Sequence, residues 1–456
     1  MSKKTGNIYF VHAVDTEGPL YENIDEIFKR IKEYYGIDIK ASEENLNKLQ
    51  KKEIDCGKFT DAISEMLRSD QITFKDTWDK IYEMMDSLMS NEFRNQLPDM
   101  DGNGYVFSWF CVDHVGYNNN PRRRTMGFHG IHEEYQRILK KYNCEVDRLY
   151  WHYHPMSFSK DAHRSGNNFN FTNLHNEILT RRIIDHSWFP AAFRPTSSIR
   201  MDGNVWLEQW IPFELGNMNV DDHESLMNNQ RLTGVYGLDN DCRGSPTDWS
   251  IYNPNIRDYR KQGTLKRYIG RCLNVKSYTL EINEMELTKA FEKAKSGENV
   301  LVSVTNHDFR DMVKETNDFV SLVKSVSEKY TDVGFKWSNT VAAFRNVVGI
   351  KRQDPVSFSI FISENILHVK SNKQIWGPQP FLAIKTKEGK YYTDNFINDD
   401  EYNWRYSFDS WTIELDSIQS IGVATNDLSG NTVVYVNNLI DLKNNWKQSV
   451  YNNNDY

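Results

Sequence analysis

Apolar runs of strand length alternate with segments of helical periodicity over the first three quarters of the chain. The runs that predict strands are 7–14, 105–112, 146–151, 190–193, 299–304 and 333–337. The segments that predict helices are about 131–142, 173–186, 285–296 and 313–329. Strands that alternate with helices are typical of a parallel sheet or barrel. We therefore predict an α/β domain over residues 1–348.

Two regions break this alternation. Residues 21–95 are rich in Glu, Lys, Ile and Leu, with helical spacing at Ile24, Ile27 and Ile31, and predict a helical insertion after the first strand. After residue 348 short alternating runs are separated by turn residues, at 356–360, 366–369, 381–384, 411–415, 421–424 and 432–436. This pattern is typical of a small β-sandwich, which we expect over residues 349–456.

Polar side chains recur where the expected strands end. They are Asp15, Asp113, His152, Arg194 and His307. In β/α barrels the chemistry is carried by residues at the carboxyl ends of the strands. A single shared mouth is therefore expected.

Two of these strand ends carry pairs of possible metal ligands. His152 and His154 are two residues apart, as are Asp15 and Glu17, and residues i and i+2 of an extended chain point the same way. Two imidazoles and a carboxylate with an open position are typical of a hydrolytic divalent-metal site. The simpler alternatives are hydrogen-bonded histidines at a barrel rim and carboxylates that cap a following helix.

Other polar residues are candidates for substrate contact. Asp113 and His114 end the second strand, and the basic run 122–124 follows it. Arg124 would suit a phosphate or uronic acid if it faces the mouth, although a solvated loop is the commoner role of such a run.

Composition narrows the possible partners and compartment. The formal net charge is -8 and no domain is strongly basic, so nucleic acid is not an expected partner. No apolar stretch is long enough to cross a bilayer. Five scattered cysteines without a CxxC pair and the lack of a signal-peptide pattern indicate reduced thiols in the cytoplasm.

The order of these motifs resembles the NodB-homology polysaccharide deacetylases, carbohydrate esterase family 4. The motifs are Asp15-Thr16-Glu17-Gly18-Pro19, His152-Tyr153-His154, Phe193-Arg194-Pro195, Asp248-Trp249 and Thr305-Asn306-His307-Asp308. The resemblance covers about residues 5–346. It is closest to the WbmS-like branch of bacterial O-antigen clusters, on the basis of the helical insertion and of the aromatic segment 206–213 after the Arg-Pro motif.

The resemblance implies a distorted (β/α) barrel of about seven strands and a metal-dependent N-deacetylase or N-deformylase. The metal would be zinc, with cobalt, nickel, manganese or iron as alternatives. The substrate would be an N-acylated sugar of bacterial surface-polysaccharide biosynthesis, such as lipopolysaccharide, linked to a nucleotide or a lipid. The implied roles are Asp15 as base, Glu17, His152 and His154 as metal ligands, Arg194 as the residue that holds Asp15, His307 as acid, Asp248 as its orienting partner and Trp249 as a substrate contact.

Two spacings differ from the family pattern. Thr16 separates carboxylates that are adjacent in the family, so Asp15 and Glu17 could exchange roles. The two histidines are at i and i+2 instead of i and i+4, which leaves His163 as an alternative ligand to His154. Two other functions stay open, a hydrolase of the amidohydrolase type and a catalytically inactive barrel that binds glycans through the sandwich.

Overall fold

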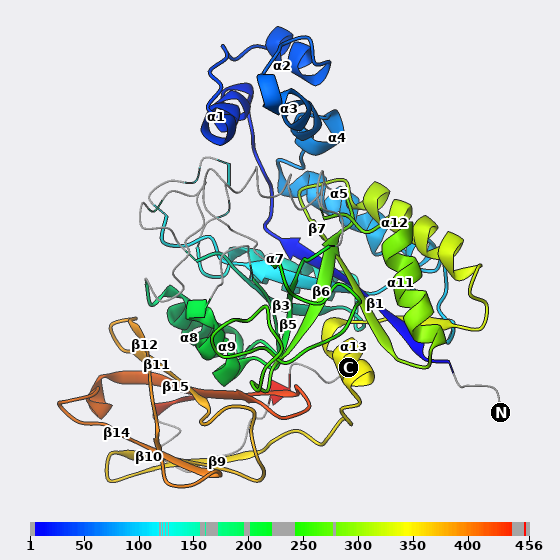
Figure 1. Ribbon diagram of the computed structural model, residues 1–456. Coiled ribbons are helices and arrows are strands. Elements are labelled where there is room, and N and C mark those ends of the chain that lie inside the picture. Colours follow the sequence, from blue (N-terminus) through cyan, green and yellow to red (C-terminus); the bar gives the residue numbers. More distant parts are fainter. Residues whose placement is uncertain are drawn as a thin grey trace.

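The computed structural model describes residues 5–117, 120, 122–123, 125, 127–155, 160, 172–195, 201–220, 242–276, 280–439 and 451–452. These residues form a barrel with helices around it, a helical lobe on one side of the barrel, and two antiparallel sheets on the other side (Figure 1). The expected α/β barrel and C-terminal β-rich domain are confirmed.

Seven parallel strands close the barrel in the order β2-β3-β4-β5-β6-β7-β1, because β1 also pairs with β2. The strands are β1 (Asn7–Thr16), β2 (Phe107–Val112), β3 (Arg148–Tyr153), β4 (Ala192–Pro195), β5 (Phe213–Asn217), β6 (Tyr268–Asn274) and β7 (Val300–His307). An eighth strand, β8 (Gly334–Trp337), pairs with the amino-terminal half of β1. All residues of β2 and nearly all of β1 and β7 are buried, as expected of parallel strands covered on both faces.

The sequence pattern did not predict β5 and β6. Both strands interrupt their apolar residues with charged side chains that are buried in ion pairs. Glu214 of β5 accepts from Nε of Arg267 at 2.8 Å, and Arg271 of β6 donates to Glu286 at 2.5 Å. A reading of hydrophobicity alone takes such residues for solvent-exposed positions.

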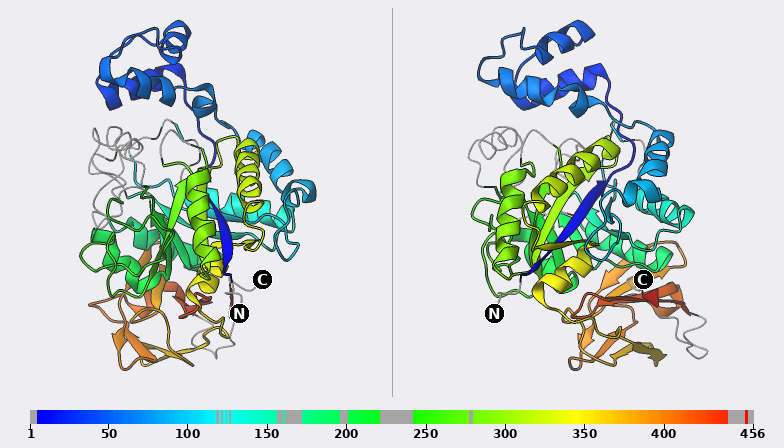
Figure 2. Two further views of the ribbon diagram at one scale, coloured as in Figure 1. Left: turned by 45° about the vertical axis from the view of Figure 1, so that its right-hand side comes forward. Right: turned by 90° about the vertical axis from the view of Figure 1, so that its right-hand side faces the viewer.

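Helices cover the outside of the barrel (Figure 2). They are α7 (Gly130–Lys141), α8 (Leu174–His186), α9 (Met201–Trp210), α11 (Glu284–Lys295), α12 (Met312–Ser327) and α13 (Thr340–Val348). The four helices expected from the sequence pattern are confirmed within two residues at each end. Helices α9 and α13 were not predicted.

The segment between β1 and β2 is helical, as expected. It contains α1 (Ile24–Tyr35), α2 (Glu43–Gln50), α3 (Thr60–Met66), α4 (Ser69–Ile72), α5 (Trp78–Leu88) and α6 (Asn91–Arg94). The first four helices share a small apolar core of their own, centred on Ile31 and Ile63. Helix α5 instead packs into the barrel core through Ile81 and Met85. The lobe α1–α4 therefore projects from the barrel at the end where β1 and β7 finish (Figure 1).

The C-terminal region consists of two sheets around a common apolar core. One sheet contains β13 (Ile397–Asn398), β14 (Asn403–Ser407), β10 (Ile366–Ser371) and β9 (Phe358–Ser363). The other contains β12 (Tyr391–Asp394), β11 (Phe381–Thr386), β15 (Ile418–Asn426), β16 (Thr432–Asn438) and β17 (Tyr451–Asn452). This arrangement is consistent with the expected sandwich.

The prediction of a strand at 411–415 is wrong. Residues 411–414 form no strand, a short 3-10 helix spans Leu415–Ser417, and the Trp411 side chain is 94% exposed. The alternation of apolar residues there comes from a turn, in which Asp409 accepts hydrogen bonds from the backbone N–H groups of Trp411 and Thr412.

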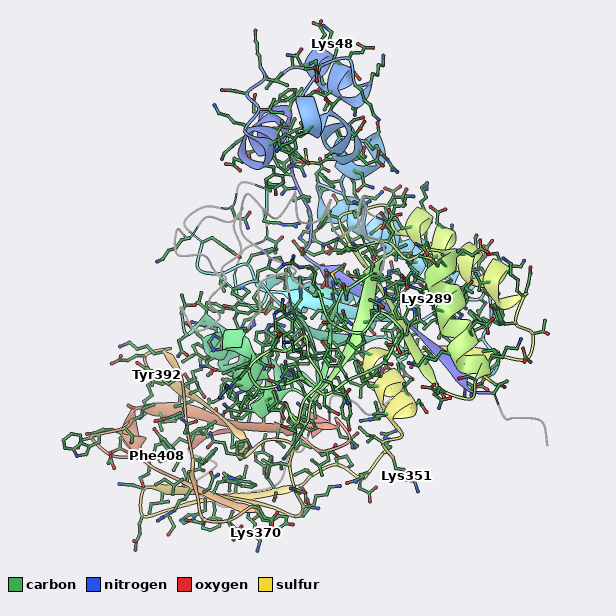
Figure 3. All side chains as sticks on the ribbon, in the orientation of Figure 1. Lys48, Lys289, Lys351, Lys370, Tyr392 and Phe408 are labelled. Atoms are coloured by element: carbon green, nitrogen blue, oxygen red, sulfur yellow. The ribbon has the colours of Figure 1, made fainter. Side chains whose placement is uncertain are left out.

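The sandwich and the barrel share one apolar cluster, in which Phe381 and Ala424 of the sandwich pack with Phe189 and Trp210 of the barrel. Figure 3 shows the side chains of both parts on the ribbon. Within the described ranges no helix has both the length and the apolar character needed to cross a bilayer. All five cysteines are free thiols.

Candidate metal and hydrolytic site

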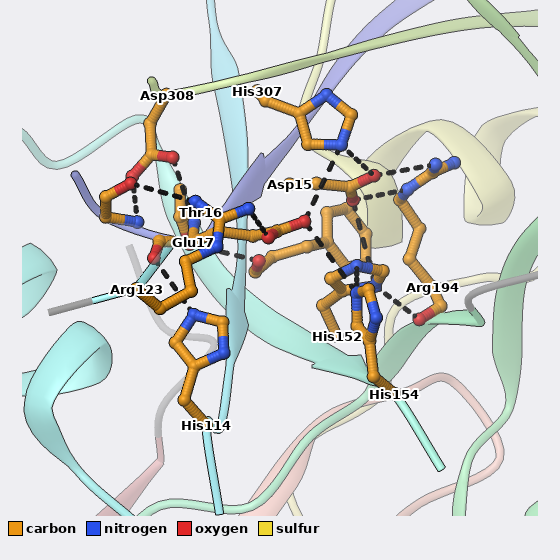
Figure 4. Close-up of polar contacts among 12 residues, drawn as sticks. Asp15, Thr16, Glu17, His114, Arg123, His152, His154, Arg194, His307 and Asp308 are labelled. Atoms are coloured by element: carbon orange, nitrogen blue, oxygen red, sulfur yellow. Dashed lines mark hydrogen bonds and ion pairs between the residues drawn. The ribbon is translucent and has the colours of Figure 1, made fainter. Parts of the chain in front are cut away.

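Strand register brings the expected site residues together at the carboxyl end of the barrel. Asp15 of β1 is the register partner of His307 of β7. His152 of β3 is the register partner of Arg194 of β4. Both pairs lie at one barrel mouth and point toward one another (Figure 4).

Glu17, His152 and His154 form a group that could hold a metal ion. One ligand atom from each residue lies within 4.8 Å of the others, and this is the one such group of three among the described residues. Two imidazoles and a carboxylate suit zinc or a similar first-row ion. The predicted ligand set is thus brought together, while His163, the alternative to His154, lies outside the described residues.

The orientation of His152 favours metal binding through Nε2. Its Nδ1 donates to the backbone carbonyl of Arg194 at 2.9 Å, since a carbonyl can only accept. This leaves a lone pair on Nε2, which lies 2.9 Å from Nε2 of His154. Burial, followed by His152, lowers the pKa of His154 to about 3, so the His154 ring is neutral near pH 7. Neutral imidazoles are the form that binds metals.

Arg194 holds Asp15 in a bidentate ion pair. Its Nε and Nη2 donate to the two carboxylate oxygens at 2.6 and 2.9 Å, and both side chains are buried. Burial alone would raise the pKa of Asp15, but Arg194, followed by His152, lowers it to about 2. Asp15 is therefore ionised and fixed in position, as expected for a residue that accepts a proton at a defined place.

His307 faces both carboxylates of the acidic motif. Its Nε2 lies 3.6 Å from a Glu17 oxygen and 4.0 Å from an Asp15 oxygen. Burial lowers its pKa to about 4, so the ring is neutral at pH 7. The expected acid, His307, and the expected base, Asp15, are therefore close enough for one water molecule to bridge them.

Asp308 holds the turn that carries Glu17. Its two oxygens accept the backbone N–H groups of Glu17 and Gly18 at 2.9 and 2.8 Å, and Tyr135 donates to it at 2.9 Å. Burial raises its pKa to about 6. Gly18 has φ of 72°, a conformation that favours glycine. The sequence placed Asp308 next to His307 but gave no signal for this role.

Arg123 and His114 complete the surroundings of Glu17. Arg123 donates to one Glu17 oxygen and stacks on Phe309 at 4.6 Å, while Nε2 of His114 lies 3.0 Å from the Glu17 carbonyl oxygen. Burial would raise the pKa of Glu17, but Arg123, followed by His154, holds it well below its usual range. Of the basic run, Arg123 reaches the site, whereas Arg124 lies outside the described residues.

The remaining expected residues are used elsewhere. Asp113 is buried against Arg182, with which it forms a 2.7 Å ion pair, and it accepts from the Trp151 indole. His114 is buried behind Glu17. Substrate contact by these two side chains is not supported, because each has an internal partner.

The Asp-Trp motif does not reach His307 in the described structure. The Asp248 side chain is 66% exposed and pairs with Lys293 at 3.2 Å. Trp249 is buried, donates to the Glu286 carbonyl of α11 at 2.9 Å and lies under Arg271. The observed partners of Asp248 and Trp249 thus lie around α11, and the structure lends no support to a role of Asp248 in orienting His307 or of Trp249 in binding substrate.

The chain matches no family model, no curated protein and no solved structure, so the geometry of this mouth is the ground on which its function is proposed.

Proposed function

We propose that this protein is a metal-dependent hydrolase that removes an N-acyl group, acetyl or formyl, from a sugar. One observation supports the proposal above the others. The candidate metal group of Glu17, His152 and His154 lies beside an Arg-held carboxylate, Asp15, and a neutral histidine, His307. Amide hydrolysis at a metal site needs this combination of a Lewis acid, a base and a proton donor.

A bound divalent ion, zinc in our proposal, would lower the pKa of its water to about 7 and polarise the acyl carbonyl. Asp15 takes the proton of the attacking water, because Arg194 fixes its carboxylate and keeps it ionised. Asp15 passes this proton to His307, whose ring is neutral in the free protein and whose Nε2 lies 4.0 Å from an Asp15 oxygen. His307 then delivers the proton to the nitrogen of the leaving amine as the C–N bond breaks.

The sugar substrate is proposed from the motif order, which resembles that of the polysaccharide deacetylases. The O-antigen branch of that family suggests a role in bacterial surface-polysaccharide biosynthesis. Five free thiols favour a reducing compartment, for which we propose the cytoplasm and a nucleotide- or lipid-linked substrate.

Acetate or formate release tests the proposal. The zinc-loaded protein should release one of these acids from an N-acylated sugar. Asp15→Asn should keep the metal, because Glu17, His152 and His154 are unchanged. Its kcat should fall at least about 100-fold, because the substitution removes the proposed base. Full activity of Asp15→Asn would contradict the base assignment. A metal-free wild type that still binds sugar would instead support the inactive glycan-binding barrel.

A further inference from the structure

A second pocket lies beside the mouth, between the helical lobe and the barrel. It has a volume of about 490 Å³, and its lining includes Lys75, Lys80, Lys276 and Lys314. The lysines come from three separate segments: Lys75 and Lys80 from the insertion, Lys276 from the loop after β6, and Lys314 from the first turn of α12. All three segments meet at the end of the barrel that carries the candidate site.

The pocket has an excess of positive charge. Its lining has two acidic residues, and both have partners within the protein. Glu315 accepts from Arg310 at 2.6 Å, and Asp311 caps α12 by accepting the Lys314 N–H at 3.1 Å. Lys80 and Lys314 pair with Asp76 and Asp318, but Lys75 and Lys276 have no ion pair within the described residues. Two ammonium groups are thus available to a ligand.

The pocket shares a wall with the candidate site. The backbone N–H of Lys75 donates to the carbonyl of Phe309 at 2.7 Å, and its carbonyl accepts the N–H of Leu20 at 3.0 Å. The Phe309 ring lies 4.8 Å from the His307 ring on one side and 5.5 Å from the Phe74 ring on the other. The segment around Lys75 is therefore tied to both the acidic motif and the His307 motif, with Phe309 between the two cavities.

We propose that this pocket binds a phosphate-bearing group of the substrate while the acylated sugar lies in the mouth. Lysine ammonium groups bind phosphates as point charges, and the first turn of α12 adds the positive end of a helix dipole. The role in catalysis rests on the proposed function, whereas the binding of phosphate by the pocket does not. A diphosphate-linked N-acyl sugar is the substrate class that fits both cavities.

Binding of inorganic pyrophosphate to the metal-free protein tests the pocket by itself. Calorimetry at low salt should detect binding to the wild type and at least about tenfold weaker binding to the double variant Lys75→Gln/Lys276→Gln. The matched control is Lys48→Gln/Lys370→Gln, which removes the same charge at sites remote from the pocket (Figure 3). No binding to the wild type, or equal losses in both variants, would overturn the proposal.

Steady-state kinetics then tests the link to catalysis. With UDP-N-acetylglucosamine, the double variant should show a KM raised about tenfold and an unchanged kcat. With the methyl glycoside of N-acetylglucosamine, which has no phosphate, it should behave as the wild type. An equal KM effect on both substrates would overturn the substrate role. Lack of turnover of both substrates by the wild type would count against the proposed function and leave the pyrophosphate result to decide on the pocket.

Discussion

The Nδ1 atom of His152 lies 2.9 Å from the backbone carbonyl oxygen of Arg194. The contact joins two motifs that are 42 residues apart and fixes the tautomer of the histidine. Metal-bound histidines are commonly oriented by such a contact to the far ring nitrogen. The same residue, Arg194, holds Asp15 through its side chain, so one position on β4 orients both a candidate metal ligand and the proposed base.

His152→Ala should strongly weaken metal binding. The variant loses the ligand whose orientation is fixed by the barrel wall, and we expect the metal affinity to fall at least about 100-fold. Metal content after dialysis, measured by inductively coupled plasma mass spectrometry, checks this. His368→Ala, on the sandwich, is the control and should keep the metal. Unchanged metal content in His152→Ala would exclude this ligand group.

His154→Ala separates the two expected ligand sets. If His154 is the second imidazole ligand, this variant should lose the metal as His152→Ala does, because Glu17 and His152 alone leave the ion weakly held. The same metal analysis applies. Retention of the metal in His154→Ala and its loss in His163→Ala would transfer the role to His163.

Arg194→Met should destabilise the protein and slow the reaction. It leaves the Asp15 carboxylate buried without its bidentate partner, which costs about 3–5 kcal/mol of the free energy of unfolding. Urea denaturation followed by circular dichroism measures this loss. The double variant Asp15→Asn/Arg194→Met should recover part of the stability, since the uncompensated charge is gone. A variant as stable as the wild type would show that the pair contributes nothing to folding.

Asp308→Ala should loosen the turn that presents Glu17. Two buried N–H groups lose their acceptor, at a cost of about 1–3 kcal/mol each in the free energy of unfolding, and the metal affinity should fall with it. Asp311→Ala is the matched control, because the exposed Asp311 also accepts a backbone N–H group, that of Lys314 in the first turn of α12. Equal metal affinities in the two variants would argue against this role of Asp308.

Stability should fall in mild acid because of a buried histidine cluster between α7 and α8. His132 is fully buried, neither ring nitrogen has a partner in the described structure, and it packs on His186 and Trp188. Burial, followed by Arg182, lowers its pKa well below the usual 6.5. His129 and His186, which face Asp185 and Glu133, also have lowered pKa values, chiefly through burial.

Because folding lowers the pKa of these histidines, the unfolded state binds more protons than the folded state below about pH 6.5. The free energy of unfolding therefore decreases as the pH falls below about 6.5. His132→Phe removes this proton uptake. Between pH 8 and pH 5 the free energy of unfolding should fall less in the variant than in the wild type, by up to about 2 kcal/mol. Chemical denaturation at the two pH values measures the difference. Parallel losses in both proteins would remove His132 as a cause.

Asn426→Ala should weaken the contact between the sandwich and the barrel. Its Nδ2 donates to the carbonyls of Pro190 and Trp210, both at 2.8 Å, and these buried acceptors lose their partner. We expect the free energy of unfolding, measured by thermal or urea denaturation, to fall by about 1–3 kcal/mol. Asn372→Ala, at an exposed position within the sandwich, is the control. A loss of equal size in Asn372→Ala would show that the contact between the two parts is not its cause.

The sequence by itself determined most of the elements and the set of polar residues that meet at the barrel mouth. Apolar runs placed β1, β2, β3 and β7, because parallel strands are buried on both faces and their hydrophobicity is continuous. The polar residues that end those runs converge, since the carboxyl ends of neighbouring parallel strands meet at one edge. Asp15, Glu17, His152, Arg194 and His307 could therefore be named before their distances were known.

Only the tertiary structure decided which partners the polar residues have and which of the sequence motifs lie at the candidate site. The contacts of Asp308 and Arg123 with the Glu17 turn join segments that are distant in the sequence. The same holds for the lysine pocket and for the ion pair between Asp248 and Lys293. Strands β5 and β6 could not be predicted from hydrophobicity, because charged residues that form buried ion pairs interrupt their apolar pattern. Hydrophobic periodicity reports whether a side chain is buried, whereas the contact that compensates a buried charge is set by the packing of remote segments.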